Sequence, residues 1–334
     1  MSRAPVSESP EQTGFRIFLN NRLSQEATDA LNRGIGPLDT LTAPAQKVSV
    51  LGVGSSYSLE GVDIAFGQLD PDRVLESTTL RWVHVSSAGY TRFDTPEFRT
   101  AVKEKGIIIS NSSSVYAEPC AEHLLAFILA GARQLPASVN AVCENGSPEW
   151  DRLRAGCVPL RGQKVLMLGY GAIARRLEEM LRPLGVTVSA FRKTPQGDEP
   201  IPIVAPDHLD TALSEADHVV NILPDNADTR FFFNQARFAR LKPNARFYNM
   251  GRGTTVDQAA LLEHLQARPL AMAWLDVTDP EPLPEDHPLR HCENCFITPH
   301  IGGGHQGESV SLVRHFLENL QRFRKAEPLI DRIM

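Results

Sequence analysis

Three side chains in separate segments of this chain form a combination suited to acid/base chemistry on a small anion. Arg252 stands between two glycines, Glu281 between two prolines, and His300 between a Thr-Pro pair and an Ile-Gly-Gly run. Arginine is a permanent cation for a carboxylate, and histidine exchanges protons near neutral pH, with an acid to orient its ring. This is the set that the reduction of a 2-keto acid requires.

Each of the three residues has an ordinary structural explanation when it is taken alone. A single histidine is more often a hydrogen-bonded core residue, while Glu281 and Arg252 alone would be a solvated loop acid and a loop arginine. Their order along the chain, downstream of a glycine-rich turn, is what favours chemistry.

The elements that position these side chains are expected to form two domains. At 334 residues the chain exceeds the size of one hydrophobic core, so two units of roughly 150 residues each are expected.

The 34 basic and 40 acidic side chains give a net charge of -6. That balance argues against a nucleic-acid partner, because such proteins concentrate Lys and Arg on one surface.

Cysteine usage and apolar runs predict a cytoplasmic protein without a metal or a membrane span. Five cysteines are too few for a disulfide framework, and the C-x-x-C of Cys292 and Cys295 has no second pair at zinc spacing. Residues 1–14 lack the features of a secretory signal and are expected to be a frayed tail. The most apolar stretch, 121–132, is shorter than the roughly 18 residues that cross a bilayer, so it predicts a buried or subunit-facing helix.

Short apolar runs alternate with helical lengths along the chain, in two series. The first series has strand candidates at residues 15–19, 48–51, 62–66 and 80–85. The second has them at residues 165–168, 186–191, 218–223, 245–250, 270–276 and 295–298. The fold class is therefore α/β, with a Rossmann-type doubly wound parallel sheet from the second series and a smaller, discontinuous, flavodoxin-like α/β domain from the first.

The connection between the two series and the end of the chain set the expected domain bounds. A serine-rich loop at 111–114 precedes a helix from about Glu118 to Arg133, which looks like a domain crossing. A helix with an apolar face follows Gly304 and is expected to return to the first domain. We therefore expect a substrate domain of residues 1–116 and 301–334, and a dinucleotide-binding domain with a dimerisation helix at 117–300.

A glycine turn at the start of the second series predicts a dinucleotide site. Gly169, Gly171 and Ala174 fit G-x-G-x-x-G/A, directly after an apolar strand and at the start of a helix. The first glycine permits a tight turn, the second lets the backbone approach a pyrophosphate, and the alanine allows close helix packing. The free amides of Ala172 and Ile173 would face the anion.

The residues after the next strand favour NADP. Where an acid would bind the ribose hydroxyls of NAD, 23 residues after Gly169, the chain has Arg192, followed by Lys193. Both supply charge-assisted hydrogen bonds to a 2′-phosphate, which a carboxylate would repel. NAD stays an alternative, since Arg192 could instead stack on the adenine.

From about Leu80 to its end, the sequence resembles the D-isomer-specific 2-hydroxyacid dehydrogenases, which include glyoxylate/hydroxypyruvate, phosphoglycerate and D-lactate enzymes. The resemblance rests on seven ordered motifs: Ser87-Ala88-Gly89-Tyr90, Ala121-Glu122-His123, the glycine turn, Asn249-Met250-Gly251-Arg252-Gly253, Leu275-Asp276-Val277, Glu281-Pro282-Leu283 and Thr298-Pro299-His300-Ile301-Gly302-Gly303.

The resemblance implies a role for each of the three chemical residues. Arg252 would bind the substrate carboxylate and polarise the carbonyl, while His300 would protonate the developing alkoxide and take the proton back in the reverse direction. Glu281 would hydrogen-bond the other ring nitrogen. The backbone amides of Ala88 and Gly89 would face the substrate carboxylate.

The resemblance also implies a set of cofactor contacts. Asp276, at the end of an apolar strand, would hold the nicotinamide carboxamide, although a helix-capping role is the alternative. The other cofactor contacts that it implies are Leu223, Pro224, Thr229, Met250, Gly251, Gly302 and Gly303. Pro224 could equally end its strand. Arg92 and Trp150 are candidates for the substrate pocket, although a loop arginine and a core or interface tryptophan are the commoner roles.

A small unphosphorylated acid such as glyoxylate or hydroxypyruvate is the expected substrate. The chain stops at Met334, where many phosphoglycerate members continue into a regulatory domain, and it shows no phosphate-binding cluster beyond Arg92. Two alternatives stay open: an oxidoreductase acting on phosphite, and a non-enzymatic dinucleotide sensor like the family's corepressors. Formate members are disfavoured because they place Gln where Glu281 stands. The helix at 121–132 predicts a homodimer, since the family pairs its subunits there.

Overall fold

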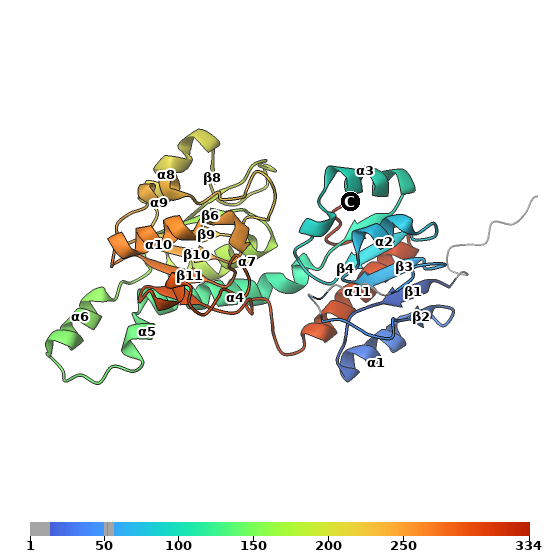
Figure 1. Cartoon of the computed structure of the whole chain (residues 1–334), viewed down its shortest axis with the longest axis horizontal. Helices are drawn as coiled ribbons and strands as arrows, with labels where there is room; N and C mark the ends of the chain where they lie inside the picture. Colours follow the sequence, from blue (N-terminus) through green and yellow to red (C-terminus); the bar gives the residue numbers. More distant parts are fainter. Residues whose placement is uncertain (1–13, 50–51, 53–56) are drawn as a thin grey trace, which may run out of the picture. The chain divides into compact units, whose positions relative to one another are not determined.

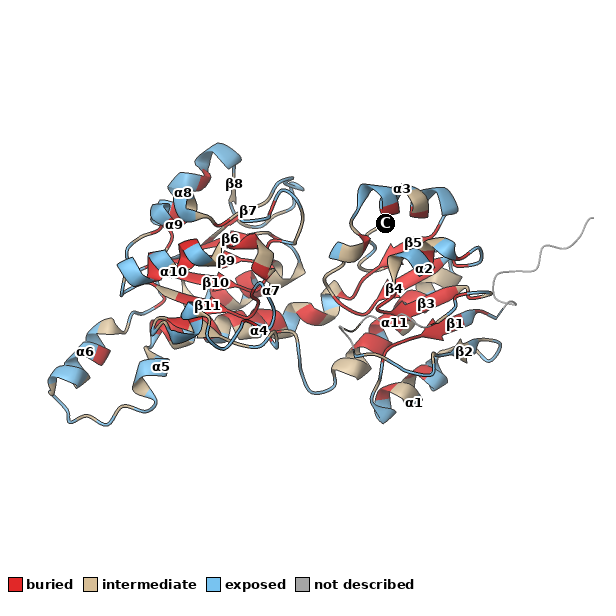
Figure 2. Cartoon of the chain, in the orientation of Figure 1, coloured by how far each residue is buried: buried red, intermediate tan, exposed pale blue. Residues whose placement is uncertain are grey.

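The structure, a computed structural model, describes residues 14–49, 52 and 57–334. The chain divides into two compact units (Figure 1): unit 1 is Met1–Tyr116 with His305–Met334, and unit 2 is Ala117–Gly304. Each unit has a parallel sheet of its own, with buried strands and outward-facing exposed helix faces (Figure 2). The predicted fold class is confirmed.

Unit 1 is built on a five-stranded parallel sheet in the order β2-β1-β3-β4-β5. Its strands are β1 (Arg16–Leu19), β2 (Thr40–Thr42), β3 (Ile64–Gly67), β4 (Trp82–Val85) and β5 (Ile108–Ser110). Its helices are α1 (Gln25–Gly34), α2 (Pro71–Glu76), η2 (Thr91–Phe93), α3 (Pro96–Lys105) and α11 (Glu308–Arg324). The strands β3 and β4 are buried along their whole length, as expected for parallel strands covered on both faces.

The C-terminal helix α11 completes the core of unit 1. The ring of Phe316 stacks on Phe66 at 4.6 Å and on Trp82 at 5.2 Å between ring centroids. A Cβ added at Gly34, the last residue of α1, would lie 2.3 Å from Leu317 Cδ1, so a glycine there lets α1 and α11 pack closely. The first and last parts of the chain therefore share one hydrophobic core.

Unit 2 is built on a seven-stranded parallel sheet in the order β12-β11-β10-β9-β6-β7-β8. Its strands are β6 (Lys164–Leu168), β7 (Thr187–Phe191), β8 (Ile203–Val204), β9 (His218–Asn221), β10 (Arg246–Asn249), β11 (Met272–Leu275) and β12 (Cys295–Ile297). The strand order reverses between β6 and β9. Open α/β sheets bind ligands at the carboxyl ends of the strands on either side of such a reversal.

The helices of unit 2 include a long one that begins in unit 1, α4 (Ser113–Ala132). The others are α5 (Leu135–Ser138), α6 (Pro148–Gly156), α7 (Ala172–Leu181), η3 (Arg182–Leu184), η4 (Pro206–His208), α8 (Leu209–Glu215), α9 (Gln235–Arg240), η5 (Gly253–Thr255), α10 (Gln258–Ala267) and η6 (Pro288–His291). None of the helices that the structure describes is long and apolar enough to cross a membrane.

The strand predictions hold in outline, and they miss the short strands. Each of the six candidates in the second series contains a strand, but β2, β5 and β8 were not predicted. They have only two or three residues, and β2 is not buried, so no long apolar run marks them. Of the candidate at 48–51, residues 50 and 51 lie outside the described part, and Val48 forms an isolated bridge with Asn21. Residues 1–13 of the expected tail lie outside it too.

The expected loop at 111–114 is wrong in its second half, because α4 begins at Ser113. The carboxylate of Asp331 accepts hydrogen bonds from the Ser114 amide at 2.7 Å and from the Ser114 hydroxyl at 2.9 Å. These bonds satisfy donors in the first turn of the helix. Since Asp331 lies 217 residues away in the sequence, the local pattern of serines could not reveal this start.

Candidate active site

The glycine turn joins the end of β6 to the start of α7. Gly169 has a φ of +97°, and an added Cβ would lie 3.0 Å from the Ile222 carbonyl oxygen, so a side chain would be strained there. An added Cβ at Gly171 would meet nothing within 4 Å, so the backbone at this residue borders open space. Gly171 provides no side-chain cap for α7, whose first amides can therefore bind an anion. The turn fits the pyrophosphate of a dinucleotide.

The predicted cofactor contacts after β9 and β10 lie next to one another. An added Cβ at Gly251 would lie 2.5 Å from the Leu223 carbonyl oxygen, so the two strand ends approach closely there. The hydroxyl of Thr229 donates to the Pro224 carbonyl at 2.6 Å and closes the loop after β9. Met250 lies beside Gly302, whose added Cβ would be 2.7 Å from the methionine sulfur.

Asp276 organises the loop that carries His300. Its carboxylate is 1% exposed and accepts hydrogen bonds from the Thr298 hydroxyl at 2.6 Å and from the amides of Ile301 and Gly302 at 3.0 and 2.9 Å. Gly303 follows in the same turn. Oδ1 accepts two of these bonds and Oδ2 one, which leaves Oδ2 able to accept another. The resemblance implied a nicotinamide contact for Asp276, with helix capping as the alternative, so its hold on this loop was missed.

The loop presents His300 in a constrained backbone conformation. The amide of His300 donates to the Asp276 carbonyl at 2.9 Å, and its φ is +54°. A left-handed conformation costs a residue with a side chain about 1 kcal/mol or more, and such conformations concentrate at functional sites. The anchoring of the loop by Asp276 is what offsets this cost.

His300 and Glu281 form the predicted pair. Nδ1 of His300 lies 2.5 Å from Oε1 of Glu281, and the two side chains are 31% and 39% exposed. A ring that donates Nδ1–H to a carboxylate has Nε2 free to exchange a proton with another molecule. The partial exposure leaves this pair accessible.

Arg252 shares the electrostatic environment of that pair. The Asn249 amide group and the Thr255 hydroxyl donate to the Arg252 backbone carbonyl at 3.1 and 2.6 Å, and Nη1 of Arg252 donates to the Gly251 carbonyl at 2.7 Å. Burial lowers the pKa of Arg252, while the charge of Glu281 opposes that shift. An arginine stays charged despite such a shift, so unit 2 brings together a half-buried cation and an acid/base pair.

Helix α4 contributes two side chains near these groups. Nε2 of His123 lies 3.4 Å from the Thr298 hydroxyl and 3.8 Å from the Asp276 carboxylate. Burial, and then the charge of Asp276, raise the pKa of the Cys120 thiol to about 12, while Arg252 opposes the shift. The thiol is therefore protonated at neutral pH. His123 lies in one of the motifs of the family resemblance, which implied no role for it.

The predicted phosphate-binding cations already have acidic partners. Nη1 of Arg192 lies 2.8 Å from Oε1 of Glu199, and Nζ of Lys193 lies 2.5 Å from the Asp228 carboxylate. Glu199 was not predicted, although the Gly-Asp-Glu-Pro run at 197–200 follows the cations closely in the sequence. That run was the available signal.

The predicted substrate contacts of unit 1 lie in the loop after β4. Asn111 donates to the Ala88 carbonyl at 2.7 Å, and the Ser87 hydroxyl donates to the Gly89 carbonyl at 2.7 Å. Side chains thus hold this loop in place, and the contact of its amides with a substrate stays a prediction. So do the pocket roles of Arg92, in η2, and of Trp150, whose ring packs against the Arg154 guanidinium in α6.

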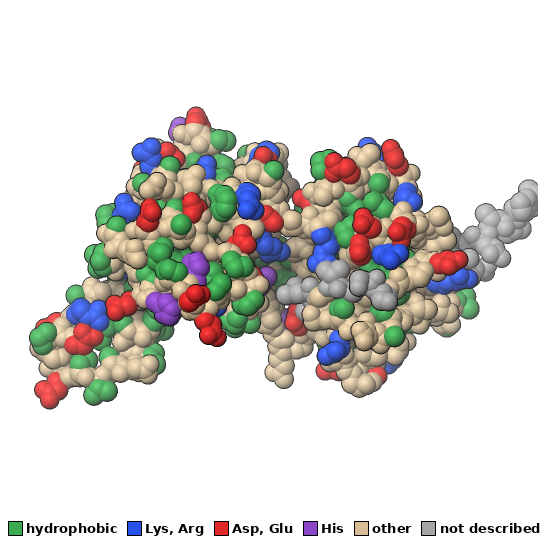
Figure 3. Space-filling model, viewed as in Figure 1, with side chains coloured by type: hydrophobic (Ala, Val, Ile, Leu, Met, Phe, Trp, Pro, Cys, Tyr) green, Lys and Arg blue, Asp and Glu red, His purple; other side chains and the backbone are tan. Residues whose placement is uncertain are grey.

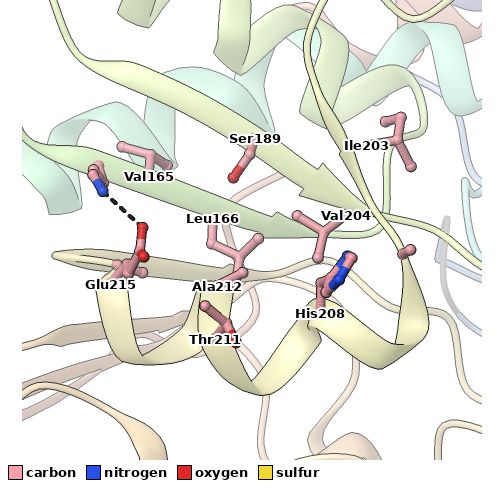
Figure 4. Close-up of a pocket in the computed structure, with 12 residues that line it drawn as sticks. Val165, Leu166, Ser189, Ile203, Val204, His208, Thr211, Ala212 and Glu215 are labelled. Atoms are coloured by element: carbon pink, nitrogen blue, oxygen red, sulfur yellow. Dashed lines mark hydrogen bonds and ion pairs between the residues drawn. The ribbon is translucent and has the colours of Figure 1, made fainter.

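A hollow elsewhere in unit 2, about 390 Å³ in volume, contains none of the predicted site residues. It lies between α8 and the strands β6, β7 and β8 (Figure 4). Apolar side chains such as Val204 and Ala212 line it, and an ion pair of Lys164 with Glu215 lies at its edge. His208 also lines it, and its Nδ1 lies 3.9 Å from the Asp207 carboxylate, with the two side chains 74% and 79% exposed. Among the described residues, no His, Cys, Asp or Glu cluster could hold a metal ion.

Comparisons with known proteins identify the family of this chain. Residues 125–302, more than half of the chain, match the family described as D-isomer specific 2-hydroxyacid dehydrogenase, NAD binding domain. The chain belongs to this family. It is therefore an NAD(P)-dependent oxidoreductase of the 2-hydroxyacid dehydrogenase type, and the resemblance stated from the motifs is confirmed.

Relatives and solved structures extend over most of the chain. Human glyoxylate reductase/hydroxypyruvate reductase is 30% identical over 327 residues, which cover 94% of this chain and 96% of the human one. Glyoxylate/hydroxypyruvate reductase B of Pectobacterium atrosepticum is 30% identical over 270 residues, covering 78% and 81%. The TT0316 protein of Thermus thermophilus is similar in structure, with a TM-score of 0.73, 25% identity and coverage of 96% and 100%.

Proposed function

We propose that this protein reduces a small unphosphorylated 2-keto acid, such as glyoxylate or hydroxypyruvate, to its D-2-hydroxy acid, and catalyses the reverse reaction. The observation that carries the proposal is the 2.5 Å contact of His300 with Glu281 beside the half-buried Arg252. Relatives named as glyoxylate/hydroxypyruvate reductases, about 30% identical to this chain, support this substrate class.

The residues of unit 2 divide the work of this reaction. Arg252 binds the carboxylate and carbonyl oxygen of the acid, because its planar guanidinium matches two oxygens at once. His300 delivers a proton from Nε2 to the carbonyl oxygen, while Glu281 holds Nδ1 and stabilises the charged ring. Asp276 keeps the His300 loop in place. The bound nicotinamide cofactor supplies the hydride.

We propose NADPH as the preferred cofactor and NADH as an accepted one. The glycine turn at Gly169 and Gly171 takes the pyrophosphate, Ala172 and Ile173 contribute amides, and Arg192 with Lys193 lies where the adenosine ribose is expected. Leu223, Pro224, Thr229, Met250, Gly251, Gly302 and Gly303 would complete the contacts.

A homodimer and a cytoplasmic location remain parts of this proposal. Exposed apolar side chains at the end of α4 and in the segment after it support a subunit contact; they are Leu129, Leu135, Val139 and Val142.

The protein is also not expected to bind nucleic acid. On the face shown in Figure 3, the acidic and basic side chains of each unit are interspersed, and no single-sign patch stands out.

The loss of reduced-nicotinamide absorbance tests the proposal. NADPH and NADH are offered separately with glyoxylate, hydroxypyruvate, pyruvate and 2-ketobutyrate, with His300→Ala as the blank. Turnover that the variant loses is the expected result. Tight cofactor binding without turnover of any acid would contradict a 2-keto acid reductase; oxidation of phosphite with NADP⁺ or NAD⁺ would then assign the site to phosphite, and its absence would indicate a sensor.

A further inference from the structure

Glu199 occupies an enclosed anion site directly beside the end of β7. Its Oε1 accepts hydrogen bonds from Arg192 Nη1 and from the Gln196 amide, each at 2.8 Å, and its Oε2 accepts one from the Gly197 amide at 2.9 Å. The Glu199 side chain is only 4% exposed, and that of Arg192 is 20% exposed. Two backbone amides and a guanidinium are the donors that bind a phosphate in many proteins.

The other ion pairs near this edge are open to solvent. Lys193 and its partner Asp228 are largely exposed, as is Asp198, which lies 3.2 Å from Arg175. Exposed ion pairs of this kind contribute little to stability, and their side chains separate readily. The carboxylate of Glu199 differs, because its side chain is 4% exposed and three donors bind it. Hydrogen bonds from the amides, that of Gln196 first, lower the pKa of Glu199, which keeps it ionised at neutral pH.

We propose that Glu199 is a specificity-determining residue that limits the preference of this enzyme for NADPH. The inference rests on the proposed function, which places the adenosine ribose beside Arg192. A 2′-phosphate would need the guanidinium that Glu199 already holds, and two like charges would share one cation. A cofactor with free ribose hydroxyls carries no charge there and needs no displacement of Glu199. The Glu199 carboxylate therefore weakens the binding of NADPH and leaves the binding of NADH unchanged.

Binding of nucleotide fragments to the full-length protein tests this role without turnover. Adenosine 5′-monophosphate and adenosine 2′,5′-bisphosphate differ only in the 2′-phosphate, and isothermal titration calorimetry gives a Kd for each. In Glu199→Gln, the Kd of the bisphosphate should fall about tenfold, the effect expected for removing one shielded like charge, while the Kd of the monophosphate stays within twofold.

Three further single variants and one double variant make the result specific. Asp198→Asn removes the same charge one residue earlier, from an exposed carboxylate, and should change the Kd of the bisphosphate by less than about threefold. Arg192→Gln should weaken bisphosphate binding and abolish the gain when combined with Glu199→Gln. Glu199→Asp keeps the charge and should keep the wild-type ratio of the two Kd values.

The outcomes separate the inference from the proposed function. If Glu199→Gln leaves the ratio of the two Kd values unchanged, or weakens bisphosphate binding, Glu199 does not oppose the 2′-phosphate and the inference is wrong. If Glu199→Gln fails to fold, Glu199→Asp provides the test, because it keeps the negative charge. A bisphosphate Kd that falls tenfold in Glu199→Asp would show that the charge is not the cause, and the inference would be wrong. If the wild-type protein binds neither fragment and neither NADH nor NADPH, the proposed cofactor site itself is wrong.

Discussion

His218 and His300 are two histidines of unit 2 with opposite surroundings. His218 begins β9 and is fully buried; its Nδ1 lies 2.9 Å from the Tyr248 hydroxyl and its Nε2 2.5 Å from the Gln163 side-chain oxygen. Burial, with the nearby charge of Arg246, lowers the pKa of His218 to about 3. His300 is partly exposed, and its Nδ1 contacts the carboxylate of Glu281.

The difference bears on the acid/base role proposed for His300. Both ring nitrogens of His218 meet neutral partners in a dry interior, so the ring stays neutral and serves packing. His300 has a carboxylate partner on Nδ1, and its Nε2 is left for a ligand. The charge of the partner and access to solvent therefore distinguish the surroundings of the two rings, since the side chain itself is the same.

Removing the His300 ring should have the largest effect on activity. His300→Ala should lower kcat/KM for the 2-keto acid about 10³-fold, because general acid/base catalysis supplies a factor of this order. Steady-state kinetics measure this loss, and calorimetry should find the Kd of the cofactor within about threefold of the wild type. A variant that retains a tenth of wild-type kcat/KM would place His300 with His218 as a structural residue.

Neutralising Glu281 should have the next largest effect and should act on the chemical step. Glu281→Gln can still accept the Nδ1–H bond, but it cannot stabilise a charged ring, so kcat should fall about 10²-fold with little change in KM. Glu285→Gln removes an exposed acid from the same loop and should leave kcat within twofold. Equal kcat values for Glu281→Gln and Glu285→Gln would show that the contact with His300 is only structural.

Asp276 should affect the His300 loop through the backbone. In Asp276→Asn, an NH₂ group replaces one acceptor and faces backbone donors, so the variant should lose about 2 kcal/mol of stability and about tenfold in kcat. Urea unfolding and steady-state kinetics measure the two effects. Asp257→Asn, at the N-cap of α10, is the matched control, because Asn caps a helix as well as Asp. If both variants match the wild type, the carboxylate of Asp276 does not hold the loop.

The sequence predicted the site residues that belong to short, recognisable motifs. The glycine turn and the Arg252, Glu281 and His300 motifs each depend on neighbouring residues. The two series of apolar runs, which alternate with helical lengths, predicted both sheets. Because glycines and prolines restrict the backbone locally, these patterns carry structural information without the rest of the fold.

The features that the sequence did not reveal depend on distant partners or on short elements. Asp331 satisfies the first turn of α4 from the far end of the chain, and Asp276 holds amides 25 and 26 residues away. Neither pairing leaves a local pattern. Glu199 is close to Arg192 in the sequence, but the dinucleotide-binding pattern ends at the cations. The low exposure of the Glu199 side chain is visible only in the folded loop.

His218 should have no effect on catalysis and a measurable one on acid stability. Its folded-state pKa of about 3 lies below the ordinary 6.5, so between these values the unfolded chain binds a proton that the folded protein does not. The stability tied to a neutral His218 is fully present above pH 6.5 and is lost as the pH falls toward 3. At pH 5 the loss should be about 2 kcal/mol.

His218→Gln removes this titration and should reduce the loss of unfolding free energy between pH 7 and pH 5 by about 2 kcal/mol, with kcat/KM within threefold of the wild type. Urea unfolding at the two pH values measures the difference. His208→Gln, which removes an exposed histidine in η4, should lose as much stability as the wild type. If all three proteins lose the same stability on acidification, His218 takes up protons in the fold, and its contrast with His300 disappears.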